Sequence, residues 1–385
     1  MPRGITLQLL TGPLRYHPAP RAVIESLQEA QVTENAGQRS GFQLRFALGK
    51  SSELEQMLVG RKLDPPARVL IVLHIDGTPH VLSDGVITRH DIAQSNEAGQ
   101  STLTITGVDI SQMLDLIDLS GLPLPMPIEA QVLLMLAPLA IYGTVPAVVP
   151  SALVWVPNPI KLIPCVQGTA YSHITGLADD VGYTFFVEPG NRPGLNVAYW
   201  GPEYRISMPQ PALTVNSDIH SNVESLSFSF DGISRTVFVL TYYPSETAKI
   251  PIPIPLPDLT PLSPPLGRKI PIPLSYKRMN IVRRTESDGS DDSTARMEAV
   301  EVVARGLARA SQAANVISGS GSLDVMRYGR LLRSRRLVGV RGAGQAYDGE
   351  YVVRSVTTTI KAGEVKQRFT LARNMQVSLF GKVLR

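Results

Sequence analysis

The chain has 385 residues, of which 43% are hydrophobic and 18% are charged, and it carries a formal net charge of +4. This composition excludes an intrinsically disordered chain and predicts about two to four domains with buried cores. The charge is too small for a dedicated nucleic-acid-binding protein, and a single cysteine, Cys165, excludes an intramolecular disulfide and a thiolate metal cluster. The first residues lack the order of a secretory signal, and the lone cysteine fits assembly in a reducing compartment.

Residues 1–118 are predicted to form a first module of antiparallel strands. Alternation of apolar and polar residues indicates its strands, at residues 5–10, 27–33, 41–48, 67–75, 83–90 and 101–107. A short helix is expected at 52–58 and a helical cap at 111–117. Asp84 and Gly85 are expected to form a tight turn, because this dipeptide accepts positive backbone dihedrals. About six strands with one crossing helix indicate a small antiparallel β-barrel, which leaves no exposed sheet edge.

Residues 119–217 combine a hydrophobic arm with a small α+β middle domain. The arm at 132–156 contains no charged residue and is long enough to cross a membrane. Its three prolines argue against a membrane helix, because they would leave backbone polar groups unsatisfied in lipid. We therefore expect a buried helix over 128–141, followed by an extended arm that contacts other subunits. The α+β domain comprises a helix and two strands, at residues 171–181, 182–187 and 196–202.

Residues 218–385 are predicted to form a second, larger module. Strands are expected at 223–230 and 235–243, paired with each other. A proline-rich insertion follows at about 246–292, and its alternating Ile-Pro repeats favour an extended arm or spacer that cannot form a ladder on one edge. The acidic, serine-rich end of this insertion, residues 286–293, is expected to be a loop.

The second module repeats the order of the first, with a strand, a helix, a strand and a hairpin. A helix with an apolar stripe is expected from residue 293 or 294 until Gly319 and Gly321. A second Asp-Gly turn, at Asp348 and Gly349, then precedes the strands of the hairpin, at residues 350–356 and 366–373. Two related β-modules in one chain place two copies of one surface in any assembly, which favours scaffolding over chemistry.

The sequence contains no recognisable catalytic, cofactor-binding or metal-binding motif. No histidine pair has the helical spacing of a zinc site, and neither a nucleophile elbow nor a phosphate-binding loop with lysine is present. Residues 339–344 resemble a dinucleotide loop, but a strand is expected after them instead of a helix, so a turn between strands is favoured. We therefore expect no enzyme activity, no cofactor and no metal.

Six arginines crowd the segment before the second hairpin, and they are the candidate interface residues: Arg327, Arg330, Arg333, Arg335, Arg336 and Arg341. One interpretation is a solvated strand face. The other is a rim that docks onto an acidic ring of a partner or lines a channel, because the guanidinium fork matches carboxylates. Nucleic-acid binding is disfavoured, since Tyr328 is the only aromatic residue interleaved with these arginines.

Two groups of segments are similar to segments of one known family. In the middle of the chain they are Gln-Gly-Thr, Gly-Tyr-Thr-Phe and Tyr-Trp-Gly-Pro, at 167–169, 182–185 and 199–202. The more specific group lies near the C-terminus, at 337–344, 348–353 and 369–373. These segments resemble the phage late control D proteins, the baseplate hubs of contractile tails and of phage-tail-like injection systems. The same family is similar to the hub half of type VI spike proteins.

The resemblance implies a non-enzymatic, trimeric hub that acts as a symmetry adaptor. Each subunit would give two similar barrels, so that three subunits match a hexameric inner tube on one side and a trimeric spike on the other. The implied partners are the other copies of the homotrimer, the spike protein, an inner tube or tube-initiator protein, and inner baseplate proteins. The hub would nucleate tube assembly. Because the chain stops at Arg385, we expect the spike to be a separate polypeptide.

The implied location is the baseplate of a virion or phage-tail-like particle that is assembled in the bacterial cytoplasm. Neither nucleic-acid contact nor stable membrane insertion is expected. Two other function classes stay open at this point. The uncharged arm also fits a membrane-associated or pore-forming component of such a particle, and a tail-tip cell-wall hydrolase is the third class, although no residue predicts it.

Overall fold

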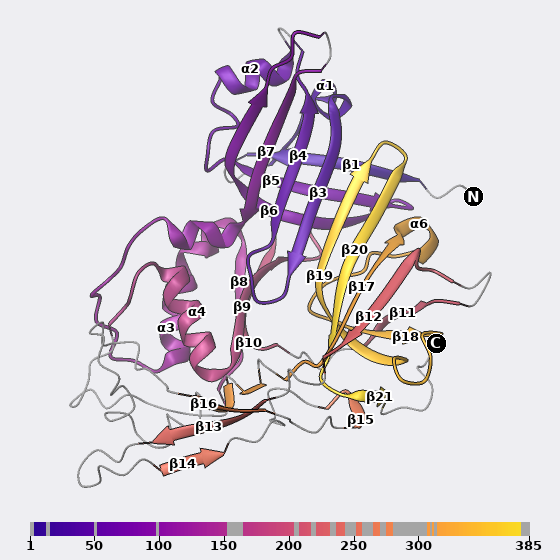
Figure 1. Ribbon diagram of the computed structural model, residues 1–385. Helices are drawn as coiled ribbons and strands as arrows, with labels where there is room; N and C mark the ends of the chain where they lie inside the picture. Colours follow the sequence, from indigo (N-terminus) through magenta and orange to yellow (C-terminus); the bar gives the residue numbers. More distant parts are fainter. Residues whose placement is uncertain are drawn as a thin grey trace.

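The protein is mainly β with some helices, and its centre is a 13-stranded sheet. Figure 1 shows the N-terminal strands beside the C-terminal ones, with a helical middle domain at the side. The computed structural model describes the chain over residues 4–12, 16–49, 52–97, 100–151, 165–203, 208–216, 221–231, 236–242, 252–255, 265–269, 275–279, 306–308, 310–311 and 314–378.

The N-terminal part of the sheet follows the predicted alternation of apolar and polar residues. Its strands are β1 (Ile5–Thr11), β2 (His17–Pro18), β3 (Leu27–Asn35), β4 (Gly41–Ala47), β5 (Arg68–Ile75), β6 (Thr78–Ala93) and β7 (Thr102–Asp109). In β4, Phe42, Leu44 and Phe46 are buried and the residues between them are exposed, because successive side chains point to opposite faces. The short helices α1 (Arg21–Glu25) and α2 (Glu53–Val59) precede β3 and β5, and the 3₁₀-helix η1 (Ile110–Asp115) follows β7.

The C-terminal part contributes the remaining strands of the same sheet. They are β11 (Gln210–Thr214), β12 (Ser225–Phe230), β17 (Ile317–Asp324), β18 (Leu337–Arg341), β19 (Gly349–Lys361) and β20 (Glu364–Arg373). One short helix, α6 (Val325–Tyr328), lies between β17 and β18. Residues 342–348 connect β18 to β19 as a turn and bend, with Gly342 and Gly344 in the left-handed region. The turn expected at 339–344 thus begins only at residue 342, because residues 339–341 belong to β18.

The two parts of the sheet have the same strand order. The first module has the order β3-β4-β7-β6-β5, and the second has β12-β17-β20-β19-β18. A short helix follows the second strand of each module in the chain, as α2 and as α6. The long strand of each hairpin also contains one irregularity, between Ile87 and Arg89 in β6 and between Val353 and Ser355 in β19. The internal repeat seen in the sequence is therefore a repeat of topology and of register.

The modules are not separate closed barrels, which corrects the expected architecture. Within the described residues the sheet is an open path, and it passes from one module to the other where β19 pairs with β3. The reason is geometric, because the edge of β3 is occupied by a strand of the second module instead of a strand of its own. One hydrophobic core accordingly includes buried side chains of both modules, such as Phe42, Val353 and Phe369.

The prediction of a turn at Asp84 and Gly85 was wrong, because both residues lie inside the continuous strand β6. The turn between β5 and β6 is formed instead by Asp76 and Gly77, whose φ values are 52° and 80°. Gly85 is required for a different reason, since a Cβ atom there would lie 2.2 Å from the carbonyl oxygen of Val108. An Asp-Gly dipeptide therefore allows close strand packing at residues 84–85 and forms a tight turn at residues 76–77.

The middle domain combines three helical segments with a three-stranded sheet. Its elements are α3 (Ile128–Leu136), η2 (Ala137–Tyr142), β8 (Thr144–Val148), α4 (Ala170–Val181), β9 (Tyr183–Pro189) and β10 (Asn196–Pro202). The sheet order is β8-β10-β9. Trp200 is fully buried against α4, where its Nε1 donates to the carbonyl oxygen of Ile174 at 3.4 Å. The predicted helix and two strands of this domain are confirmed.

The hydrophobic arm lies partly inside this domain. Val132, Leu136 and Leu139 are buried in the middle core, and β8 pairs with β10 of the same chain. Residues 152–164, which complete the arm, lie outside the described residues, so its contact with other subunits stays a prediction. None of the helices in the described part of the chain is long and apolar enough to span a membrane.

The predicted pairing of the strand before the proline-rich insertion was wrong. The strand β13 (Thr236–Tyr242) does not pair with β12; it pairs with β14 (Ile252–Pro255) and β16 (Ser275–Met279). β14 contains the Ile-Pro repeat and pairs on one side only within the described residues, which fits the missing proline donors. A further short pair joins β15 (Gly267–Lys269) to β21 (Gln376–Ser378).

The glycines expected to end the long helix lie instead inside β17. Residues 306–308 and 310–311 are helical, whereas the rest of the expected helix up to residue 305, and the acidic loop, lie outside the described residues.

Candidate functional site: the polar junction between the modules

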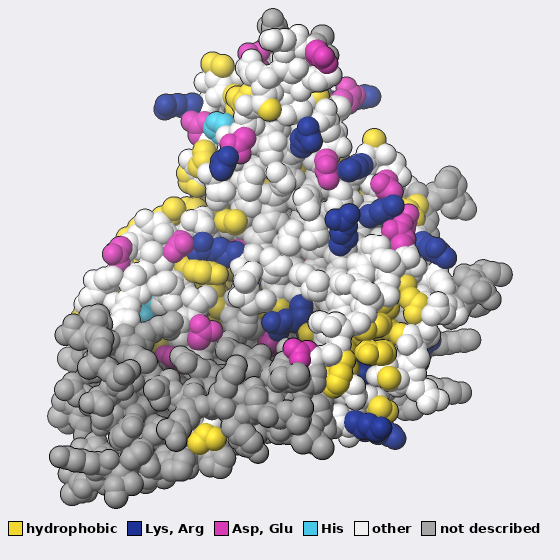
Figure 2. Space-filling view, viewed as in Figure 1, with side chains coloured by type: hydrophobic (Ala, Val, Ile, Leu, Met, Phe, Trp, Pro, Cys, Tyr) yellow, Lys and Arg dark blue, Asp and Glu magenta, His cyan; other side chains and the backbone are white. Residues whose placement is uncertain are grey.

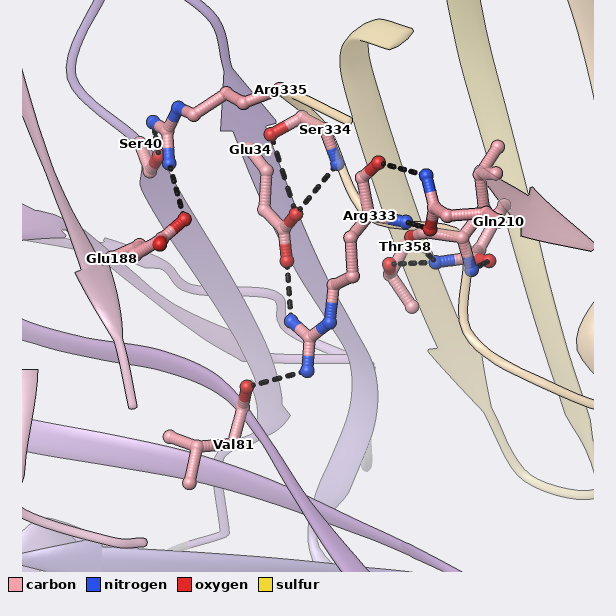
Figure 3. Close-up of polar contacts among 11 residues, drawn as sticks. Glu34, Ser40, Val81, Glu188, Gln210, Arg333, Ser334, Arg335 and Thr358 are labelled. Carbon is pink, nitrogen blue, oxygen red and sulfur yellow. Dashed lines mark hydrogen bonds and ion pairs between the residues drawn. The ribbon is translucent and has the colours of Figure 1, made fainter. Parts of the chain in front are cut away.

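The functional candidate in this chain is a polar junction between the two modules. Among the described residues, no group of three or more His, Cys, Asp or Glu side chains is placed to hold a metal ion. The junction lies where the segment after α6 crosses from the second module onto β3 of the first. Figure 3 shows Arg333, Ser334 and Arg335 pointing from this segment toward Glu34 and its neighbours.

Glu34 receives the first of these arginines. Arg333 Nη1 lies 2.6 Å from Glu34 Oε1, and Arg333 Nη2 donates to the carbonyl oxygen of Val81 at 2.8 Å. The backbone N–H of Ser334 donates to the other carboxylate oxygen, Oε2, at 3.1 Å. The carboxylate thus accepts hydrogen bonds on both oxygens, and charge-assisted bonds of this kind are stronger than neutral ones. Arg333 ties the second module to β3 and β6 of the first.

Arg335 connects three parts of the chain from an almost fully buried position, with 4% of its surface exposed. Its Nε donates to the carbonyl oxygen of Asn35 at 2.9 Å, and its Nη2 donates to Ser40 Oγ at 3.0 Å. The guanidinium also lies 3.9 Å from the ring centroid of Phe186 and 4.0 Å from Glu188 Oε2, both in β9 of the middle domain. One side chain therefore joins both modules and the middle domain.

Two glutamines hold the backbone of the crossing segment. Gln210 accepts from the N–H of Arg333 at 2.8 Å and donates to its carbonyl oxygen at 2.9 Å. Gln367 makes the same pair of bonds to Leu332, at 2.8 and 3.0 Å, and also donates to Thr358 Oγ1. These bonds fix the backbone at Leu332 and Arg333. The side chains of Arg333 and Arg335 therefore start from a well-held segment of chain.

The six arginines predicted as one surface are divided by the structure. Arg333 and Arg335 face inward at the junction. Arg341 is half-buried in β18. Arg327, Arg330 and Arg336 are exposed, so these three are the members that a partner can reach.

A second polar site, between the first module and the middle domain, was missed by the sequence analysis. Arg68 and Asp84 form a two-bond ion pair, with Nε–Oδ1 and Nη2–Oδ2 distances of 2.7 Å, and both side chains are buried. Asn196 Nδ2 donates to the same carboxylate at 2.8 Å, and Arg68 also donates to the carbonyl oxygen of Tyr142. Burial and the nearby Asp84 charge raise the pKa of Tyr16 to about 12.

A buried carboxylate also marks the end of β7. Asp109 accepts from the N–H groups of Ser40 and Ser111, at 2.7 and 3.0 Å, and it caps η1. Burial raises the pKa of Asp109, and the hydrogen bonds and the charge of Arg335 oppose that rise. The first two sites join domains, whereas Asp109 joins Ser40, just before β4, to the start of η1.

Comparison with solved structures shows a shared fold. A tail protein from Neisseria meningitidis superposes with a TM-score of 0.61 and 15% identity, over 96% of this chain and 97% of that chain. A 43 kDa tail protein of prophage MuSo2 from Shewanella oneidensis gives a TM-score of 0.59 and 14% identity, over 96% and 99%. An Escherichia coli component of the type VI secretion system, described as similar to the T4 tail proteins gp27 and gp5, gives 0.50 and 11%, over 94% and 76%.

No protein-family model matches the sequence, and no curated protein matches it either. At identities of 11–15% the matched structures establish the fold alone. The chain therefore has the fold of these phage-tail and type VI secretion proteins along nearly its whole length.

Proposed function

We propose that the protein is the structural baseplate hub of a contractile tail or tail-like injection system. The hub is a homotrimer that adapts a hexameric inner tube to a trimeric spike and nucleates assembly of the tube. The observation that carries this proposal is the strand order that occurs twice in the chain, β3-β4-β7-β6-β5 and β12-β17-β20-β19-β18. Three chains would then present six alike modules, which is the number that a hexameric tube requires.

The shared fold supports this proposal. The matched tail proteins superpose over nearly all of both chains, so the whole chain and not one domain has the tail-protein architecture. The partners proposed are the spike as a separate chain, the inner tube or tube-initiator protein, and inner baseplate proteins. The location proposed is the baseplate of a virion or tail-like particle.

The mechanism is mechanical and not enzymatic. A hub must transmit the force of sheath contraction without separating its modules, and the junction described above supplies that rigidity. Arg335 joins both modules and the middle domain, while Arg333 and Glu34 join the two modules directly. The exposed Arg327, Arg330 and Arg336 are proposed as a rim for an acidic partner surface.

The test is co-expression of the chain with the tube and spike proteins of its own particle, followed by electron microscopy. The hub is expected to increase the number of tubes and to lie at one end of each tube, bound to the spike. The matched control is the same co-expression without the hub. Equal numbers of uncapped tubes in both samples would contradict the proposed function.

A further inference from the structure

The joint between the two modules is an antiparallel pairing of strand edges. The outer half of β19 pairs with β20 on one side and with β3 on the other, where residues 355–360 lie opposite residues 30–35. On the partly buried outer face of this joint, Thr33 Oγ1 and Thr357 Oγ1 lie 3.2 Å apart, and on the core face Thr358 lies opposite Val32. The chain thus contains one complete example of how two modules are joined.

The repeat identifies the equivalents of these strands. The irregularity in β6 and the one in β19 place Arg89 and Ser355 at equivalent positions, opposite Thr106 and Thr370. In the same alignment β12 is equivalent to β3, because Ser227 lies opposite Ser320 as Gln31 lies opposite Gln43. The outer half of β6, residues 89–93, is therefore the counterpart of the part of β19 that accepts β3.

Both counterparts have an unpaired edge within the described residues. β5 pairs with β6 only as far as Val86, so residues 89–93 of β6 pair with β7 alone. β12 lies at the end of the sheet and pairs with β17 alone. Open edges of this kind pair readily with another chain. Figure 2 shows hydrophobic side chains gathered in the region where β12 lies in Figure 1.

Each of these two edges carries an exposed large apolar side chain. Ile92 in β6 is 46% exposed and Phe230 in β12 is 39% exposed. The residue equivalent to Ile92 in the internal joint is Thr358, which is 3% exposed and lies opposite Val32 of β3. By comparison with the internal joint, the edge of β6 lacks a partner strand equivalent to β3. Within the repeat, the strand equivalent to β3 is β12.

We propose that β12 of one copy pairs with the outer half of β6 of a second copy, in the same antiparallel register as β3 with β19. This inference rests on the self-association in the proposed function and deepens it by naming the two edges. The register places Ile92 opposite Phe228, Asp91 opposite Ser229, and His90 opposite Phe230 of the second copy.

The paired residues are chemically complementary. Ile92 and Phe228 would meet on the core face, and an aliphatic side chain against an aromatic ring is a favourable cross-strand pair. Asp91 and Ser229 would meet on the other face, where the serine hydroxyl can donate to the carboxylate, as Thr33 and Thr357 bond in the internal joint. Each copy carries one edge of each type, so the contact is head-to-tail. With a rotation of about 120° between copies it would close into a ring of three chains that contains six joined modules.

Disulfide cross-linking tests this register directly. In a C165S background, D91C/S229C is expected to form disulfides between chains, because opposite residues in antiparallel strands have Cα atoms about 4.5–5.5 Å apart. The control D91C/S225C moves the second cysteine four residues along β12, about 13 Å at 3.3 Å per residue, and should not cross-link. T33C/T357C, in the internal joint, should form a disulfide within one chain and verifies that the conditions are sufficient.

A charge substitution provides an independent measurement. Ile92→Arg is expected to reduce the assembly to monomers, whereas Val59→Arg, at an 82% exposed position in α2, should leave its mass unchanged. A stable oligomer in which D91C/S229C does not cross-link would overturn the edge pairing and leave the hub intact. A monomeric C165S protein at every concentration would overturn the edge pairing together with the proposed trimer.

Discussion

Replacing Arg68 with methionine is expected to lower the free energy of unfolding by about 3–5 kcal/mol. The substitution leaves the Asp84 carboxylate buried and opposed by no charge, because Asn196 supplies only a neutral donor. It also removes the hydrogen bond to the carbonyl oxygen of Tyr142, and so weakens the contact between the first module and the middle domain. Urea unfolding followed by circular dichroism measures the change.

Two further variants distinguish the effect of leaving a buried charge unpaired from the effect of removing any arginine. Arg61 forms an ion pair with Asp64 that is 86% and 41% exposed, so Arg61→Met should change stability by no more than about 0.5 kcal/mol. The double variant R68M/D84L removes both charges and should recover a large part of the loss. Equal unfolding midpoints for the Arg68 and Arg61 variants would show that Asp84 does not depend on its partner.

The second large effect is expected at the junction. Arg335→Met keeps most of the side-chain volume but removes the donors to Asn35 and Ser40 and the charge beside Glu188. Hydrogen bonds from charged groups contribute about 1.5–3 kcal/mol each, so a loss of about 2–4 kcal/mol is expected after partial rehydration. Hydrogen exchange should also increase in β9, because the middle domain loses its contact with the crossing segment.

Arg336 provides the matched control, since it is the next residue and is exposed. Arg336→Met should unfold like the parent chain and leave hydrogen exchange in β9 unchanged. If both arginine variants lose the same stability, the junction does not depend on Arg335, and the rigid connection between the modules would need another cause.

The sequence was sufficient to predict the helices and strands whose apolar residues recur at a regular spacing. The strands β4, β5, β9 and β10 and the helix α4 were predicted within a few residues, because burial on one face imposes a period on the residues. The duplicated hairpin was also predicted, with an Asp-Gly dipeptide before each copy. The two Asp-Gly dipeptides are not equivalent, since Ser83 corresponds to Gly349 in the strand registers.

Non-local contacts explain what could not be predicted. Asp84 lies in a strand, opposite Leu70 of β5, and Arg68, 16 residues earlier in the chain, binds its carboxylate as an ion-pair partner. Gly319 and Gly321 look like helix terminators, but they make room in β17 for the rings of Phe228 and Phe369. β12 was paired with the next strand in the chain, whereas its partner β17 follows the whole insertion. Local residue preferences contain no information on such distant neighbours.

The arginine cluster shows the same limit at the candidate site. Spacing along the chain identified six arginines in one segment, and a shared surface was the simplest interpretation. The structure separates Arg335 from Arg336 completely, because one enters the junction and the other faces outward. Glu34, the carboxylate that receives Arg333, lies about 300 residues earlier, so only the fold brings the pair together.

Cryo-electron microscopy of the purified full-length chain tests the central claim most directly. We expect a ring of three copies of the 41.8 kDa chain in which six alike modules are joined edge to edge, with near-sixfold symmetry in projection. A single copy, a twofold dimer, or a threefold assembly whose two modules occupy different radii would contradict it.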